Sequence, residues 1–193
     1  MIVMMGSAIS IGAVAKAPSL ARADERVRRL VVEHIDSIAR ALRRLGVPQS
    51  DVDDAVQQVF LTMSRRLAEI EPHAEKAFLY KTAVHVAAHA RRTVSRRRES
   101  GEDEALTRTD DSISAEEFID RRRAAELLEQ VLDAMPSDLR VAFVLYEVEQ
   151  LPVAEIASML EIPVGTAASR LRRAREDFQE RVARLRLRMG GSP

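Results

Sequence analysis

The chain has 193 residues, of which 46% are hydrophobic and only 4% aromatic, with no cysteine and with 30 basic against 30 acidic side chains. This length allows one large domain or two small ones, and the lack of cysteine excludes a disulfide scaffold and a thiolate metal site. No apolar run is long enough to cross a bilayer, so we expect no membrane insertion.

The chain opens with a leader, residues 1–23, that is rich in small and apolar residues and is predicted to be disordered. From Asp24 to Leu45 apolar residues recur every three or four positions, and Gly46 is a natural helix stop. This spacing predicts a first amphipathic helix that ends at a glycine.

A second helix is predicted from Ser50 to about Ile70, and it contains the segment DVDDAVQQVFL over residues 51–61. Its short polar face, Asp54, Gln57 and Gln58, suits a protein–protein contact as well as it suits water. A third helix is predicted from about residue 74 to residue 92 or beyond. The three helices together predict a helical bundle over residues 24–98.

The third helix carries the segment FLYKTAVHVAAHARRTVSRRR over residues 78–98, in which aromatic and polar groups lead into a basic end. Such a helix can hold a phosphate backbone and stack unpaired bases. His85 and His89 share one face at a spacing that also suits a metal. No third ligand is visible, and Val86 stands where a zinc-protease motif has its glutamate, so we expect no metal site.

Residues 99–115 show no apolar periodicity and are rich in acidic and hydroxyl side chains, which predicts a flexible acidic linker. Helical patterns resume over residues 116–180, followed by a basic tail over residues 181–193. The net charge is zero, yet basic side chains gather in blocks on either side of this acidic stretch, which indicates local patches with different partners. The predicted fold class is all-α, with two small helical domains joined by the linker.

Residues 151–175, LPVAEIASMLEIPVGTAASRLRRAR, form the most informative segment. Pro152 suits a first helical position, and the apolar pattern is interrupted at residues 161–163. Gly165 and Thr166 open a second helix, which we expect to bury Ala167, Leu171 and Ala174 and to expose Ser169, Arg170, Arg172 and Arg173. Two short helices, a tight turn and a cationic outer face are typical of a protein that reads the DNA major groove.

The order of these parts resembles a bacterial RNA polymerase sigma factor of the sigma-70 family, of the extracytoplasmic-function (group 4) type, over residues 24 to about 180. Met135-Pro136 through Arg140, followed by EIASMLEIPVGTAASRLRRAR, is similar to region 4 of that family. DVDDAVQQVFL is similar to region 2.2, and the helix from Phe78 is similar to regions 2.3 and 2.4.

The resemblance implies a promoter-specificity subunit that binds core polymerase, recognises the minus-35 and minus-10 promoter elements and helps to open the DNA. It implies three sets of contact residues. The minus-35 set in the recognition helix is Thr166, Ala168, Ser169, Arg170, Arg172 and Arg173. The minus-10 set is Tyr80, Lys81, His85, His89, Arg91, Arg92 and Arg96. The set that binds core polymerase is Asp51, Asp54, Gln57, Gln58 and Phe60.

The implied partners are core RNA polymerase, through the clamp helices of its largest subunit and its flap, then promoter DNA, and an anti-sigma factor. The resemblance also implies a cytoplasmic location, no cofactor, no metal and no catalytic residue, with the acidic linker in the RNA-exit path. The chain departs from the family pattern at Gln58, His85, His89 and Ala168. The two histidines motivate the hypothesis that DNA opening depends on pH between about 6 and 8.

A stand-alone helix-turn-helix transcriptional regulator is the alternative. Such a regulator carries a receiver or ligand domain with alternating hydrophobic strands, whereas the N-terminal half of this chain has only helical patterns. An enzyme is a third reading, but the sequence offers no nucleophile–base pairing, no metal spacing and no phosphate cradle. A DNA-binding assay distinguishes the sigma factor from the stand-alone regulator, because a regulator binds its site unaided and a sigma factor needs core polymerase.

Overall fold

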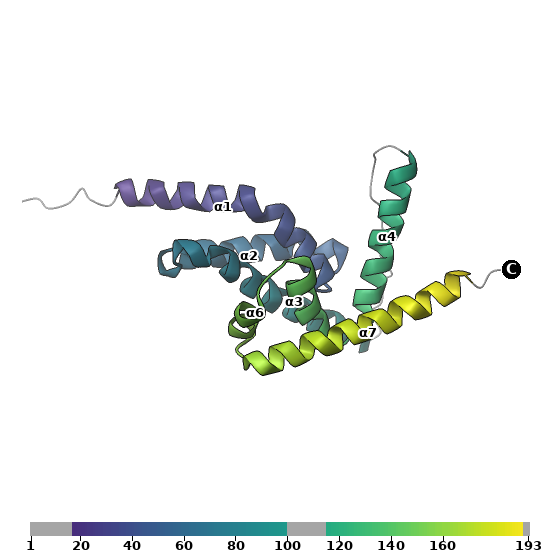
Figure 1. The fold of residues 1–193 in the computed structure, drawn as a ribbon. Coiled ribbons are helices and arrows are strands. Elements are labelled where there is room, and N and C mark those ends of the chain that lie inside the picture. Colours follow the sequence, from purple (N-terminus) through teal and green to yellow (C-terminus); the bar gives the residue numbers. More distant parts are fainter. Residues whose placement is uncertain (1–16, 100–114, 191–193) are drawn as a thin grey trace, which may run out of the picture.

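The structure, a computed structural model, describes residues 17–99 and 115–190, and in these ranges it contains helices and no strand (Figure 1). The prediction of an all-α fold is confirmed. The predicted linker lies mostly outside the described residues, as do residues 1–16 of the predicted leader and residues 191–193. The first half contains α1 (Ala17–Arg44), α2 (Val52–Arg66) and α3 (Glu75–Glu99), and the second contains α4 (Ala115–Asp133), α5 (Ser137–Phe143), α6 (Val153–Leu160) and α7 (Val164–Gly190).

Two helices are longer than the sequence pattern predicts. Helix α1 begins at Ala17, so the end of the predicted leader is helical rather than disordered. Helix α7 continues to Gly190, so most of the predicted basic tail extends the recognition helix. Ion pairs one turn apart support this extension, because Arg181 binds Asp177 at 2.6 Å and no helix breaker intervenes before residue 190.

Helices α1, α2 and α3 pack against one another as the bundle predicted for the first half (Figure 1). Short 3-10 turns, η1 (Gln49–Asp51), η2 (Leu67–Glu69) and η3 (Pro72–Ala74), connect them. The fully buried side chains at the centre include Ile38 and Leu42 of α1, Val59 and Met63 of α2 and Leu79 of α3. Their three- and four-residue spacing places one apolar stripe of each helix in the core.

Helix α1 ends in a Schellman motif at Gly46, whose φ of 94° lies in the region that favours glycine. The Gly46 amide donates to the carbonyl of Arg43 at 2.9 Å, and the Val47 amide donates to the carbonyl of Leu42 at 3.0 Å. A Cβ at Gly46 would lie 2.9 Å from Nη1 of Arg140, which belongs to the second half of the chain. The glycine therefore ends the helix and also makes room for a side chain from the other domain.

In the second half, α5 and the π-helical stretch η4 (Val144–Val148) pack on α7, which runs along the lower edge of the view in Figure 1. Phe143 stacks on Phe178 with ring centroids 4.5 Å apart. Leu145 and Ala174 are fully buried. None of the helices in the described ranges combines the length and the apolar character that a bilayer crossing needs.

The two halves are packed against each other. Helix α3 contacts α6, and the C-terminal part of α1 lies near α4 (Figure 1). Buried apolar side chains from both halves form one continuous cluster, which joins Leu45 and Val47 of the first half to Leu132 and Leu139 of the second. The sequence pattern indicates two domains and says nothing of this contact.

Candidate nucleic-acid interface

The helix-turn-helix consists of α6, the turn at residues 161–163 and the first turns of α7. Glu161 ends α6 in the left-handed conformation with φ 56°, and the Ile162 amide donates to the carbonyl of Ala157 at 3.0 Å. The carbonyl of Pro163 then accepts the amide of Thr166 at 2.9 Å and so begins α7. The chain therefore turns within three residues, as a helix-turn-helix requires.

The inner face of α7 carries the side chains that the sequence predicts as buried. Ala167, Leu171 and Ala174 are 2%, 5% and 0% exposed, and α6 packs against them. This packing holds α7 at a fixed angle to α6. The opposite face of α7 is thereby fixed as the outer face of the motif.

The outer face of α7 presents Ala168, Ser169, Arg172 and Arg173 to solvent, whereas Thr166 and Arg170 are half-buried. Arg172 forms an exposed ion pair with Glu176 one turn later, at 2.7 Å. Such a pair contributes little to stability and is readily exchanged for a phosphate. Within the described ranges no acidic side chain is paired with Arg173.

Arg170 and Arg175 lie at the edges of this face and are tied to the second half of the chain. Arg170 Nε lies 3.6 Å from Asp138 of α5. Arg175 Nε donates to Glu147 at 2.6 Å, and its guanidinium lies over the Tyr146 ring, 5.0 Å from the centroid. The hydrogen bond that Arg175 donates to Glu147 raises the pKa of Arg175. Arg175 therefore anchors α7 on η4 and has no place in the DNA-facing set.

The predicted minus-10 residues on α3 fall into two groups. His85, His89, Arg92 and Arg96 are exposed along the helix. Tyr80 is 3% exposed, and Lys81 and Arg91 are half-buried. In this arrangement the middle and C-terminal part of α3 presents these residues to solvent, and the assignment of the whole set to the minus-10 element stays a prediction.

Arg91 binds the C-terminal end of α1. Its Nη1 donates to the carbonyl of Leu45 at 2.8 Å, one of the carbonyls that a helix C-terminus leaves without a helical partner. Burial, and then the nearby charge of Arg140, lower the pKa of Arg91. A structural role for Arg91 is thus visible in the structure, which the basic run in the sequence did not indicate.

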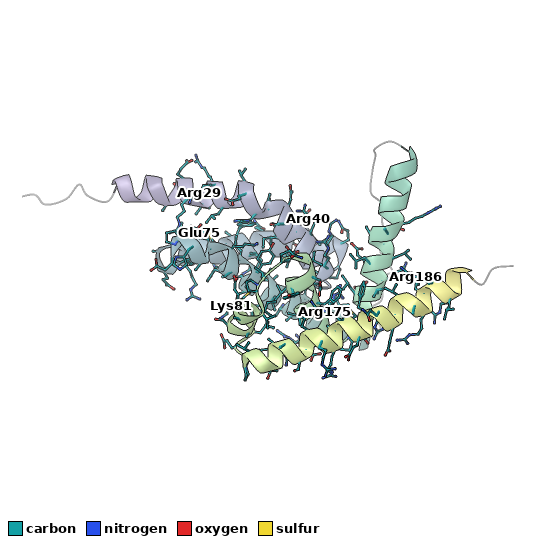
Figure 2. The ribbon with its side chains drawn as sticks, in the orientation of Figure 1. Arg29, Arg40, Glu75, Lys81, Arg175 and Arg186 are labelled. Carbon is teal, nitrogen blue, oxygen red and sulfur yellow. The ribbon has the colours of Figure 1, made fainter. Side chains whose placement is uncertain are left out.

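Tyr80 is held by the second half of the chain. Its hydroxyl donates to Oε2 of Glu149 at 2.6 Å, and burial followed by this hydrogen bond raises the pKa of Tyr80 to about 12. Lys81 Nζ donates to Oε1 of Glu161 at 2.8 Å, beside the turn that joins α6 to α7 (Figure 2). Both side chains are therefore occupied by residues of the helix-turn-helix half.

Helix α2 presents Asp54, Gln57 and Gln58 to solvent, and Asp51 is half-buried at its start. Phe60 is 8% exposed, and its ring belongs to the core because it lies on the apolar stripe with Val56 and Val59. Its role as a polymerase contact stays a prediction. Leu61, which the sequence analysis missed, is 42% exposed. Leu61 lies one helical turn after Gln57 and off the apolar stripe. This position in the helical pattern could have identified Leu61 as an exposed residue.

No group of three or more His, Asp or Glu side chains that suits a metal ion occurs in the described part of the chain. His85 and His89 are exposed along α3. The hypothesis that they make DNA opening sensitive to pH stays a prediction.

A helical bundle with a basic helix, joined to a helix-turn-helix with a cationic outer face, defines the class of two-part DNA-binding transcription proteins. Comparison with known families agrees: residues 30–97 match sigma-70 region 2, and residues 125–178 match sigma-70 region 4. The ECF RNA polymerase sigma-E factor of Escherichia coli strain K12 is 30% identical over 165 residues, which are 81% of this chain and 86% of that protein. The chain belongs to the ECF sigma factors of the sigma-70 family, the promoter-specificity subunits of bacterial RNA polymerase.

Other similar proteins agree with this assignment. The ECF RNA polymerase sigma factor SigE of Mycolicibacterium smegmatis is 29% identical over 161 residues, and the match spans 80% of this chain and 61% of that protein. The structure of CnrH in complex with the cytosolic domain of CnrY has a TM-score of 0.64 at 22% identity, covering 84% of this chain and 94% of that one. The sigma factor RpoE of Bartonella quintana, in complex with the anti-sigma factor NepR, has a TM-score of 0.62 at 17% identity, covering 81% and 96%. These two structures share the fold.

Proposed function

We propose that the outer face of α7 recognises the minus-35 promoter element in the major groove, through Ser169, Arg172 and Arg173 with support from Thr166, Ala168 and Arg170. The observation that carries this proposal is that the buried Ala167 and Leu171 fix α7 on α6, so that its exposed arginines project from a rigid helix. Arginine suits this task because its guanidinium forms two hydrogen bonds with a guanine edge or with a phosphate.

The minus-10 element is assigned to α3. His85, His89, Arg92 and Arg96 form its exposed polar row, with donors that suit phosphates and unpaired bases. Tyr80 and Lys81 extend this row toward the start of α3, and they become available only when the helix-turn-helix half moves away. Arg91 supports the row by fixing the end of α1.

The exposed face of α2 is assigned to core polymerase. Asp54, Gln57 and Gln58 supply charge and hydrogen-bonding groups, and the exposed Leu61 adds an apolar contact beside them. A polar rim around an apolar side chain is the usual composition of a protein interface. The partner surfaces are the clamp helices of the largest subunit for this face, and the flap for the second half.

An anti-sigma factor is proposed as a further partner, since RpoE of Bartonella quintana, which has this fold, was solved in complex with the anti-sigma factor NepR. The chain supplies specificity and no catalytic chemistry, so bond formation is assigned to the polymerase. A cytoplasmic location follows from the polymerase as partner.

Run-off transcription tests the proposed function. Purified core RNA polymerase is incubated with a pool of genomic promoters, with and without the full chain. Discrete start sites that appear only with both components support the proposal. Specific DNA binding by the chain alone, with no new transcript, would instead support the stand-alone regulator.

A pair of arginine variants tests the recognition helix. If Arg173 reads a base, Arg173→Ala weakens promoter binding by about 1–3 kcal/mol and relaxes specificity at one position. If it binds only phosphate, binding weakens evenly across sequences and the salt slope falls by about one. Arg186→Ala, on the exposed distal part of the same helix, is the matched control and should leave promoter binding unchanged.

A further inference from the structure

The start of α7 presents an apolar pair of side chains to solvent, Val164 and Ala168. Val164 is 54% exposed, and Ala168 is exposed one turn further along the helix. Residues four positions apart share one side of a helix, so the two side chains lie next to each other. We call this pair the methyl strip, because both side chains end in methyl groups.

Packing within the protein does not account for the methyl strip. The buried apolar residues of this part of α7, Ala167 and Leu171, lie on the face that packs on α6, which lies beside the start of α7 in Figure 1. Val164 is outside the continuous apolar cluster of the described residues. A Cβ at Gly165 would meet nothing within 4 Å, so the surface beside the strip is open. The strip is therefore available to a partner.

The methyl strip belongs to the first turns of α7, and in a recognition helix these turns contact base edges in the major groove. The exposed Arg172 continues the line of the strip one turn later. A helix rises about 1.5 Å per residue, so Ala168 and Arg172 are about 6 Å apart along the axis, which is about two base pairs at about 3.4 Å each. The strip and this arginine therefore reach neighbouring base pairs of one element.

The side chains of the methyl strip have no donor or acceptor, so they cannot form a hydrogen bond with a base edge. Thymine displays an apolar group in the major groove, the methyl group on its C5 atom, and small apolar side chains contact it. The other three bases display donors and acceptors at this edge, which the strip would leave without a partner. The chemistry of the strip thus suits thymine.

We propose that the methyl strip selects thymine in the minus-35 element, through contact of Val164 and Ala168 with C5 methyl groups about two base pairs from the one that Arg172 contacts. This inference rests on the proposed function and deepens it, because it names the base that this part of the recognition helix reads. Val164, which the sequence analysis does not place among the contact residues, becomes a residue that determines specificity.

Deoxyuridine provides the test, because it differs from thymidine only in lacking the C5 methyl group. A promoter identified by run-off transcription is prepared with each minus-35 thymine, on either strand, replaced singly by deoxyuridine. The dissociation constant of each DNA is measured with holoenzyme assembled from core polymerase and the full chain. We expect one or two replacements to weaken binding about fourfold, which corresponds to one buried methyl-sized group, and the others to leave it unchanged.

Two variants assign this loss to the methyl strip. Val164→Ser and Ala168→Gly each remove methyl groups at an exposed position, and each should bind thymine and deoxyuridine equally at one or more of the affected sites. A glycine inside a helix lowers stability, so Val164→Ser keeps the test valid if Ala168→Gly folds poorly. The matched control is Leu187→Ser, which removes an apolar side chain that is 77% exposed on the distal part of the same helix, and it should keep the fourfold loss.

Unchanged binding to every deoxyuridine promoter would overturn the inference and leave the proposed function intact. A loss that both strip variants retain would also overturn it, since another side chain would then read the methyl group. A control that loses its sensitivity to deoxyuridine would overturn it as well, because the effect would not belong to the strip. Absence of any promoter-specific transcript from wild type would overturn the proposed function, and the inference with it.

Discussion

Replacing Arg140 with alanine is the sharpest test of how the two halves are held together. Arg140 lies in α5, yet its guanidinium donates hydrogen bonds to two carbonyls at the end of α1 and forms an ion pair with Asp133 at 2.8 Å. The Arg43 carbonyl also accepts the Gly46 amide at 2.9 Å, and the C-terminus of a helix favours a cation. Arg140→Ala removes this contact and leaves a cavity beside Gly46.

The magnitude follows from the contacts that are lost. A hydrogen bond to a charged group contributes about 1.5–3 kcal/mol net, and of the two carbonyl contacts the one at 3.3 Å is long and weak. The ion pair adds about 0–1 kcal/mol, because the Asp133 side chain is 64% exposed. Relief of the desolvated charge on Arg140 offsets part of the loss. We therefore expect Arg140→Ala to lower the free energy of unfolding by about 2–4 kcal/mol.

The assay is urea denaturation of the full chain, followed by circular dichroism in the helix band. Arg140→Lys keeps the charge but lacks the planar fork, so it should retain part of the lost stability. Arg184→Ala is the matched control, because this side chain is 61% exposed and is paired with Glu180 of the same helix. This substitution should change the free energy of unfolding by no more than about 0.5 kcal/mol. The reasoning is refuted if Arg140→Ala costs no more than Arg184→Ala.

Three further outcomes are expected. Gly46→Ala should lower the free energy of unfolding by about 2 kcal/mol or more, since its φ of 94° is strained for alanine and the added Cβ meets Arg140; equal thermal stability would contradict the Schellman assignment. The pKa of Tyr80 is raised to about 12, so its protonated form stabilises the fold below the ordinary tyrosine pKa of about 10, and this contribution disappears as pH rises from about 10 to 12. Tyr80→Phe should remove the fall in the free energy of unfolding between about pH 10 and 12. A curve identical to that of wild type would show that Tyr80 does not cause this fall. Leu61→Asp should weaken binding to core polymerase at least tenfold while leaving the melting temperature nearly unchanged, because Leu61 is 42% exposed; a matching loss of stability would show that it belongs to the core.

Local pattern was sufficient for the helices and for the helix-turn-helix. The three- and four-residue spacing of apolar residues identifies the buried stripes, and Gly46 and Pro163 mark where helices end and begin. Ala167, Leu171 and Ala174 are buried as predicted, since a side chain three or four positions along a helix shares its face. The all-α fold was predictable for the same reason.

Helix ends were less predictable. The sequence pattern ends α7 near residue 180, whereas ion pairs one turn apart continue the helix to Gly190 with a largely exposed surface. Apolar periodicity reports burial, so it does not detect a helix that leaves the core. Phe60 shows a second limit, because its place in a motif shared with the family favours a contact role while its position on the apolar stripe places it in the core. The contact role stays a prediction.

By itself the sequence determined the helices, the cationic recognition face and the family, because these depend on side chains a few positions apart. Only the tertiary structure decided that Arg140 completes the end of α1 and that Tyr80 and Lys81 are held by Glu149 and Glu161. These partners lie 69 to 97 positions apart. Neither periodicity nor a local motif contains such information, since a buried hydrogen bond forms only where packing brings a donor and an acceptor together away from water.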